Sequence, residues 1–478
     1  MQLIADIFSF IFKHFFLINI LLAILIVFFE RKKPTSTWLW LMVLVFLPII
    51  GFILYLFIGQ DIRKQKIFTR KWQADIAQGE ACQFMETSVY PHDTAQDYPD
   101  IVRLHCNNGV NLWRNNDVKL FHDGKDKFAA LLESLAQAKE YIHIEYYIFR
   151  NDNLGRQVIQ TLAERAAAGV EVKLLYDGMG GLRLPRRYFR PLIEAGGKVA
   201  CFLPPFLPYI NLRVNYRNHR KICIIDGVEA WIGGFNIGDE YLGLSKRFGY
   251  WRDTHMRIRG GAVRDLQWRF ILDWQFAAGE TIRHPQRYFP APQVTGNTSL
   301  QIVSSGPDSR WSEVKDGYFK LITDARHSLY IHTPYFIPDD SIFDALRIAA
   351  LSGVDVRVII PGIRDHPFVW WASLSYIGTL LKAGVRCYVY KKGFMHSKVV
   401  VADAKVSSVG TANMDIRSFD LNFEVNAFIY DKTISRELHE RFLMDLADCE
   451  EITREIYSKL PASVRIRESI SRLLSPLL

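Results

Sequence analysis

The chain has 478 residues, of which 49% are hydrophobic and 23% charged, and its formal net charge is +9. This composition excludes a disordered chain and is sufficient for two or more domains with buried cores. The positive charge predicts a negatively charged partner, either a nucleic acid or an anionic membrane surface. The six cysteines lack the CxxC or Cys/His clustering of a zinc site, so we interpret them as reduced, mostly buried thiols.

Two apolar segments lie near the N-terminus. Residues 3–29 are interrupted only by Asp6, Lys13 and His14, and residues 38–59 contain no charge. The second segment exceeds the roughly 20 residues that cross a bilayer, so it predicts a membrane-spanning helix. The first segment is compatible with a full span, a shallow interfacial helix or an uncleaved signal-like segment.

Basic residues follow each apolar segment. Residues 31–33 are all basic, and a larger group of lysines and arginines lies within 63–71. The larger group adjoins the rest of the chain, so the positive-inside rule predicts that this rest is cytoplasmic. We therefore expect a multi-pass membrane region at 1–60 and a basic linker at 61–109.

The sequence after the linker repeats itself. Three stretches of the first half, 138–149, 166–178 and 194–202, are matched by 326–337, 350–362 and 381–390, which aligns His143 with His332. Each set reads as strand, helix, strand, helix, strand, an order that predicts mostly parallel or mixed sheets flanked by helices. The expected fold is therefore α/β, with two homologous lobes at 110–295 and 296–478 related by a two-fold-like axis.

Each repeat contains the motif H-x-K-x4-D followed by a glycine and an asparagine. The motif residues are His219, Lys221, Asp226 and Asn236 in the first repeat, and His396, Lys398, Asp403, Thr411 and Asn413 in the second. A single copy could arise by chance, but two copies at the same position of a longer repeat indicate a paired site.

The chemistry of the motif follows from strand geometry. Residues two apart on a strand point to the same face, so each motif presents one imidazole and one ammonium together. Two such faces place imidazoles on opposite sides of a phosphorus atom, where one attacks and the other protonates the leaving oxygen. Lysines and asparagines of both motifs then bind the non-bridging oxygens, so in-line displacement at a phosphodiester needs no metal or other cofactor.

A nucleophilic imidazole needs an acceptor on its second nitrogen. Each repeat supplies a candidate carboxylate on a strand that follows its motif, in WRDTHMRI and LNFEVNAFIY. We assign Asp253 to His219 and Glu424 to His396.

Four charged residues near the motifs allow more than one interpretation. Asp226 and Asp403 complete the motifs and join the catalytic set, although fixing a strand-end turn or pairing with a cation explains them equally well. Asp415 and Arg417 follow the second motif. We expect this second pair to tie the loop around the site instead of contacting substrate.

The motif blocks carry a resemblance to a known family. NHRKICIIDG, GGFNIGDEYLG, GYWRDTH, MHSKVVVAD and GTANMDIRSFDLNFEVN resemble the phospholipase D superfamily, and specifically the bacterial cardiolipin synthases. With RKKPTSTWLW near the N-terminus, the resemblance covers nearly the whole chain. It implies condensation of two phosphatidylglycerol molecules into cardiolipin and glycerol at the bacterial plasma membrane, with no metal or nucleotide cofactor.

The resemblance also bears on individual residues. The family's tendency for the first motif to attack implies that His219 is the nucleophile. Gly234 stands where the second repeat has Thr411 and many superfamily members have serine, which implies one hydroxyl donor fewer for phosphate in the first motif.

Other functions remain open to these residues. A hydrolytic phospholipase D would use water in the second step, and a related phosphatidyltransferase would use another alcohol. The superfamily also contains nucleases, but the apolar segments favour an anionic membrane over a nucleic acid as the partner. The oligomeric state is open, a homo-oligomer included.

Three segments are candidates for lipid contact. They are 203–217, 362–377 with Trp370 and Trp371, and the amphipathic C-terminal stretch 462–478. The alternatives are that the tryptophans belong to the core and that the C-terminal helix packs on the second lobe.

Overall fold

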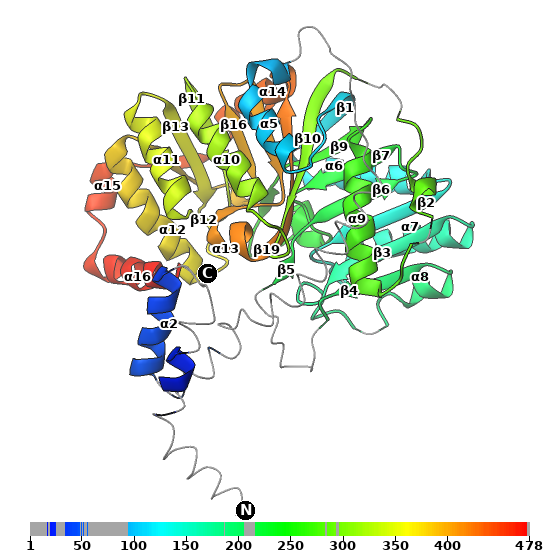
Figure 1. The fold of residues 1–478 in the computed structure, drawn as a ribbon, viewed down its shortest axis with the longest axis horizontal. Coiled ribbons are helices and arrows are strands. Elements are labelled where there is room, and N and C mark those ends of the chain that lie inside the picture. The colour runs from blue at the N-terminus through cyan, green and yellow to red at the C-terminus, as the bar shows by residue number, and fades with distance from the viewer. Residues whose placement is uncertain are drawn as a thin grey trace, which may run out of the picture. The chain divides into compact units, whose positions relative to one another are not determined.

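The structure is a computed structural model. It describes residues 17, 20–24, 34–47, 49, 51, 55, 94–185, 187–204, 216–282, 284–292 and 296–475 (Figure 1). The chain divides into two compact units, one of residues 1–78 with 205–216 and one of residues 79–204 with 217–478. Both H-x-K motifs belong to the larger unit.

The smaller unit contains the helix α2 (Pro34–Phe46), which has no acidic residue in its first turn and no basic residue in its last. The rings of Trp40 and Tyr55 pack edge to face, with centroids 5.3 Å apart. Within the described ranges, no helix is both long and apolar enough to cross a membrane. Most of the expected segment 3–29, much of 48–59 and the basic group within 63–71 lie outside those ranges.

The first repeat of the larger unit alternates strands and helices. Its strands are β1 (Trp113–Phe121), β2 (Tyr141–Tyr146), β3 (Glu171–Asp177), β4 (Lys198–Phe202), β5 (Arg217–Asn218), β6 (Lys221–Ile225), β7 (Glu229–Gly233), β8 (Tyr250–Arg252) and β9 (His255–Arg259). Its helices, preceded by α5 (Pro99–Asn107), are α6 (Gly124–Ala136), α7 (Asn153–Ala167), α8 (Arg190–Glu194) and α9 (Val263–Ala278).

The second repeat follows the same plan. Its strands are β10 (Thr298–Ser305), β11 (Ser328–His332), β12 (Phe336–Ile337), β13 (Asp355–Pro361), β14 (Arg386–Tyr390), β15 (Gly393–Met395), β16 (Val399–Ala402), β17 (Val406–Gly410), β18 (Met414–Asp415), β19 (Asn422–Tyr430) and β20 (Cys449–Ile452). Its helices are α10 (Glu313–Asp324), α11 (Asp340–Leu351), α12 (Pro367–Leu380), α13 (Ile416–Asp420), α14 (Lys432–Leu446), α15 (Arg454–Ser458) and α16 (Ala462–Leu473).

One continuous sheet runs through both repeats in the described part of the chain. Its order is β20-β14-β13-β11-β16-β17-β19-β10-β1-β9-β7-β6-β2-β3-β4, with β5 paired to β19. Parallel neighbours occur at β11-β13-β14, β2-β3-β4 and β5-β19, whereas the central strands are antiparallel. Of the two expected arrangements, mostly parallel or mixed, the mixed one is found, because tight turns and not helices connect strands such as β6 and β7. The sheet is mixed, and helices flank it in both repeats (Figure 1).

The two buried histidines that the repeat aligns occupy equivalent places. His143 in β2 lies under α9, where its Nδ1 is 3.2 Å from Gln267 Oε1. His332 in β11 lies under α14, where its Nε2 is 3.1 Å from Asp445 Oδ2. The alignment of these strands is therefore confirmed, and both histidines are parts of the core.

The segments expected to contact lipid differ in the structure. Trp371 is buried in the core of the second repeat and Trp370 packs against it, as in the alternative interpretation of 362–377. The C-terminal helix α16 is formed and leaves Ile466 and Leu473 largely exposed. Most of 203–217 lies outside the described residues.

Candidate active site

Both catalytic histidines follow short strands that pair with the opposite repeat. β5 pairs in parallel with the start of β19, and His219 N donates to Phe423 O at 3.0 Å. β15 pairs in parallel with β8, and His396 N donates to Arg252 O at 2.8 Å. Each histidine is thus placed beside a carboxylate of the opposite repeat, which lies within β19 for His219 and directly after β8 for His396.

The histidine–carboxylate pairs therefore cross between the repeats. His219 Nδ1 lies 3.0 Å from both carboxylate oxygens of Glu424, and His396 Nδ1 lies 2.7 Å from Asp253 Oδ2. The predicted assignment of Asp253 to His219 and Glu424 to His396 was wrong. The sequence shows which strands carry a carboxylate, but the pairing depends on which strand ends meet in space.

Burial and the opposing charges set the protonation of these four groups. Burial lowers the pKa of His219 to about 4 and that of His396 to about 3, against the opposite influence of their carboxylates. Although burial alone would raise their pKa values, the adjacent histidines and lysines hold the pKa of Asp253 and that of Glu424 below the ordinary range. Neutral imidazoles that donate Nδ1–H to ionised carboxylates follow, with Nε2 free to act on substrate.

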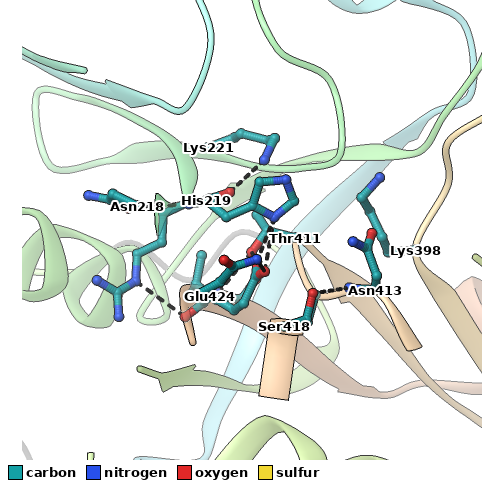
Figure 2. Close-up of polar contacts among 12 residues, drawn as sticks. Asn218, His219, Lys221, Lys398, Thr411, Asn413, Ser418 and Glu424 are labelled. Carbon is teal, nitrogen blue, oxygen red and sulfur yellow. Dashed lines mark hydrogen bonds and ion pairs between the residues drawn. The ribbon is translucent and has the colours of Figure 1, made fainter. Parts of the chain in front are cut away.

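The motif lysines are buried beside the histidines. Lys221 Nζ donates to His219 O at 2.5 Å, and Lys398 Nζ donates to His396 O and lies 2.8 Å from His396 Nδ1. Figure 2 shows Lys221 and Lys398 flanking the His219 imidazole, with Glu424 on the other side of the ring. Burial lowers the pKa of Lys221 to about 7 and that of Lys398 to about 8.

The two repeats form one centre. The charge of Lys398 acts on His219, and the charge of Lys221 acts on His396. Two imidazoles and two ammonium groups therefore converge, as the motif spacing predicted. This arrangement suits a phosphodiester, whose anionic oxygens need cationic donors and whose phosphorus needs a nucleophile and an acid.

The motif asparagines and Thr411 have partners within the protein. Asn236 Oδ1 accepts from Ile148 N at 3.2 Å, and Asn413 Nδ2 donates to Asp415 Oδ2 at 3.1 Å. Thr411 Oγ1 donates to Glu424 Oε2 at 2.5 Å. This hydroxyl thus supports the carboxylate that orients His219. Phosphate binding by Thr411 and by the two asparagines stays a prediction.

The glycine that replaces Thr411 in the first repeat has a steric cause. A Cβ at Gly234 would overlap the Asp253 carboxylate, at Oδ1 above all. Asp253 instead accepts a hydrogen bond from Thr254 N at 2.8 Å. The difference between Gly234 and Thr411 thus reflects how each carboxylate is held, and not a missing phosphate donor.

Asp226 and Asp403 serve the turns that end the motif strands. Both have positive φ, 52° and 55°, in the left-handed region that aspartate tolerates. Asp226 accepts hydrogen bonds from the backbone amides of residues 139–141, and Asp403 from those of residues 326–328. The turn interpretation is therefore confirmed, and the assignment of these two residues to the catalytic set stays a prediction.

Two buried arginines hold the carboxylate strands and were not singled out from the sequence. Arg220 donates to Asp273 Oδ2 at 2.6 Å and to Glu424 O at 3.2 Å. Arg252 donates to Asp445 Oδ2 at 2.8 Å and to Asp253 O. Each arginine adjoins a site residue in the sequence, and that adjacency was the available signal.

No group of three or more His, Cys, Asp or Glu side chains suited to a metal ion occurs among the described residues. The cations of the site are supplied by its own lysines.

Two family descriptions match the chain. Residues 131–246 and 318–446 match the family described as cardiolipin synthase, PLD-like domain. Residues 17–60 match the family described as phospholipase D-nuclease N-terminal. The first match contains both H-x-K motifs.

Relatives that match nearly the whole chain are cardiolipin synthases. The major cardiolipin synthase of Bacillus subtilis (strain 168) is 48% identical over 98% of this chain and 99% of its own length. A cardiolipin synthase of Staphylococcus aureus (strain Mu50) is 48% identical over 98% of this chain and 96% of its own length. This chain belongs to the cardiolipin synthase family. Its function is that of the family, a phosphatidyltransferase of the phospholipase D superfamily, and the resemblance of the motif blocks is confirmed.

A solved structure shares the fold. Phosphatidylserine synthase from Haemophilus influenzae Rd KW20 matches with a TM-score of 0.61 and 14% identity, over 79% of this chain and 100% of that chain. The two-repeat α/β architecture is therefore common to both proteins.

Proposed function

We propose that this cardiolipin synthase transfers a phosphatidyl group between two phosphatidylglycerol molecules through a covalent intermediate on His219. The observation that carries the proposal is the crossed pair of contacts, His219 with Glu424 and His396 with Asp253, beside two buried lysines. One imidazole can attack phosphorus while the other exchanges the proton of the oxygen on the opposite side.

In the first step, Nε2 of His219 attacks the phosphorus of the donor lipid. A phosphorus–nitrogen bond forms, the phosphorus–oxygen bond to the head-group glycerol breaks, and His396 gives its proton to the departing oxygen. The phosphodiester anion that enters the site stabilises the charged form of His396. The pKa of His396 is therefore higher with donor lipid bound than in the empty site. Glu424 stabilises the positive charge that develops on His219.

In the second step, His396 takes a proton from a glycerol hydroxyl of the second lipid. That oxygen attacks the phosphorus, the bond to His219 breaks, and cardiolipin leaves. His396 is then protonated and His219 neutral, as in the enzyme with donor lipid bound before the first step. Lys221 and Lys398 stabilise the non-bridging oxygens in both steps, with Asn236 and Asn413 as further donors.

We also propose that the chain is anchored in the bacterial plasma membrane with both repeats in the cytoplasm. The uncharged segment 38–59, the basic residues within 63–71 and the family match at 17–60 support this placement. A site at the membrane surface gives a lipid hydroxyl access in place of water. That residues 110–295 and 296–478 form two separate domains also stays a proposal. One compact unit contains both ranges except residues 205–216.

The test is the product made by the purified full-length enzyme from vesicles of labelled phosphatidylglycerol. Transfer yields cardiolipin and glycerol in equal amounts. Phosphatidic acid as the main product, without cardiolipin, would instead identify a hydrolytic phospholipase D.

A donor lipid with 4-nitrophenol in place of glycerol separates the two histidines. Nitrophenol leaves without a proton, so His396→Ala should keep the first-turnover burst of nitrophenol release while losing about 10²–10⁴ of cardiolipin formation. His219→Ala should lose both reactions, because no phosphatidyl-enzyme forms. Nitrophenol release by His219→Ala at the wild-type rate would refute the assignment.

A further inference from the structure

The two flanks of the active site differ in charge. Arg217 stands two residues before His219, whereas the equivalent position before His396 is Phe394. Phe394 is buried, and its ring centroid lies 4.8 Å from that of Trp251. The flank of the second histidine is therefore apolar where the flank of the first is cationic.

A second arginine joins this flank from the other repeat. Arg417 lies in α13, which immediately precedes β19, and β19 pairs with β5 at Arg217 and Asn422. Its equivalent in the first repeat is Glu240, which forms an ion pair with Arg150 at 3.2 Å. The arginine pair thus occurs on one side of the two-fold-like axis, at the seam between the repeats.

Tyr147 connects this pair to the first histidine. Its ring centroid lies 5.1 Å from that of His219, and Lys221 Nζ is 5.6 Å from the same ring. Tyr147 also forms a side-chain hydrogen bond with Arg217. His219 directly follows β5, and Tyr147 contacts both side chains, so Arg217 and His219 face a common space.

The two guanidinium groups are close enough to oppose one another. Burial is the largest influence that lowers the pKa of Arg417, and the charge of Arg217 lowers it further. Nη1 of Arg217 is buried without a hydrogen-bond partner among the described residues. A half-buried cation pair with an unused donor is unfavourable in the empty protein and favours a bound anion.

The nearby carboxylates have other partners. Asp177 accepts hydrogen bonds from the backbone amides of Asn218, Met179 and Gly180. Asp415 accepts from Ser418 N at 2.6 Å and from Asn413 Nδ2. Both carboxylates act on Arg417 at a distance, but their hydrogen bonds hold the loops around the site.

We propose that Arg217 and Arg417 bind the phosphodiester of the acceptor lipid, the phosphate that does not react. The inference rests on the proposed transfer between two phosphatidylglycerol molecules. The acceptor hydroxyl is joined to its own phosphate by a three-carbon glycerol, so that phosphate must lie one short bridge away from the reacting phosphorus. The arginine pair meets this requirement beside the lysine pair, and an uncharged alcohol gains nothing from it.

Comparing a charged and an uncharged acceptor tests the proposal. The full-length enzyme is given phosphatidylglycerol in mixed micelles, and two rates are measured: cardiolipin formation, and exchange of the head group with labelled free glycerol. We expect Arg217→Gln and Arg417→Gln each to slow cardiolipin formation about ten- to hundredfold and to keep the wild-type rate of glycerol exchange. Arg347→Gln, which removes an exposed arginine from α11, is the matched control and should change neither rate.

A soluble acceptor with a phosphate but no acyl chains, glycerophosphoglycerol, distinguishes the lipid phosphate from the membrane surface. The arginine variants should also lose transfer to this acceptor. Normal transfer to it would mean that the arginines bind the surface, and the proposal would be overturned.

Equal loss of cardiolipin formation and glycerol exchange would also overturn the proposal, since the arginines would then belong to the reacting centre or to the fold. Arg217→Lys and Arg417→Lys keep the charge and should recover part of the cardiolipin formation, which separates phosphate binding from misfolding. Absence of glycerol exchange in the wild-type enzyme would be a failure of the proposed two-step transfer itself, and so is distinguishable from loss in the variants alone.

Discussion

The carboxylates that orient the two histidines occupy equivalent places in the two repeats but are held differently. Glu424 accepts a hydrogen bond from the Thr411 hydroxyl at 2.5 Å, whereas Asp253 accepts one from the Thr254 backbone amide at 2.8 Å. At the position that matches Thr411, the first repeat has Gly234, where a side chain would overlap Asp253. Duplication preserved the site's plan while the supports of its two halves diverged.

This difference matters because the pairs cross between the repeats. Thr411 of the second repeat acts through Glu424 on His219 of the first, and Gly234 of the first repeat makes room for the aspartate of His396. A change near one carboxylate should therefore affect the chemistry of the histidine in the opposite repeat. Nitrophenol release reports on His219, and cardiolipin formation requires both histidines.

The largest effect is expected from the carboxylates themselves. Glu424→Gln should slow nitrophenol release about 10²–10⁴-fold, since an amide stabilises the charged imidazole poorly. Asp253→Asn should spare nitrophenol release and slow only cardiolipin formation. Glu451→Gln, which removes an exposed partner of Arg386, serves as the control for loss of a negative charge. If Asp253→Asn lost nitrophenol release and Glu424→Gln kept it, each histidine would instead pair with the carboxylate of its own repeat.

Gly234→Ala should have the next largest effect. The added methyl group displaces Asp253 and so disturbs His396, which lies in the other repeat. Cardiolipin formation should fall while nitrophenol release continues, and thermal unfolding measures any loss of stability. A uniform loss of both activities in a folded variant would contradict the steric explanation.

Thr411→Val should have a smaller effect, and it should slow nitrophenol release, which Gly234→Ala spares. Loss of one hydrogen bond to the charged Glu424 should slow nitrophenol release about ten- to hundredfold, and Thr411→Ser should restore it. The effect should disappear when Glu424 is already glutamine, because both changes act through the same contact. Additive losses in the double variant would favour direct phosphate binding by the hydroxyl.

The smallest expected effect is a shift of the pH profile. In the wild type, kcat/KM should fall as pH rises through about 7 to 8, because burial lowers the pKa of Lys221 to about 7 and that of Lys398 to about 8. Below about pH 4 it should fall again as His219 becomes protonated. The negative charge of Glu424 raises the pKa of Lys221 against the effect of burial. Glu424→Gln should therefore lower this pKa and move the alkaline limb to lower pH. An unchanged limb in that variant would contradict the electrostatic coupling.

Local spacing made much of the site predictable. His219 and Lys221 are two residues apart in the sequence, and the same spacing occurs in the second motif. Strand alternation predicts that such residues lie together, and they do, although each histidine lies between two short strands. The repeat also located the buried histidines of β2 and β11. These features need no knowledge of how distant strands meet.

The crossed pairs could not be predicted in the same way. They depend on the parallel pairing of β5 with β19 and of β15 with β8, which joins segments far apart in the sequence. The order of the central strands is likewise set by contacts beyond the repeat pattern. The turn at Asp226 and Gly227 makes β6 and β7 antiparallel neighbours.

The most direct measurement is to trap the phosphatidyl-enzyme and locate the modified residue by mass spectrometry. Nitrophenyl donor and the His396→Ala variant should accumulate the intermediate, because the first step needs no acid and the second lacks its base. The account predicts a phosphatidyl group on His219. In the wild-type enzyme, quenched during turnover, the same adduct should appear, and an adduct on His396 would contradict the account.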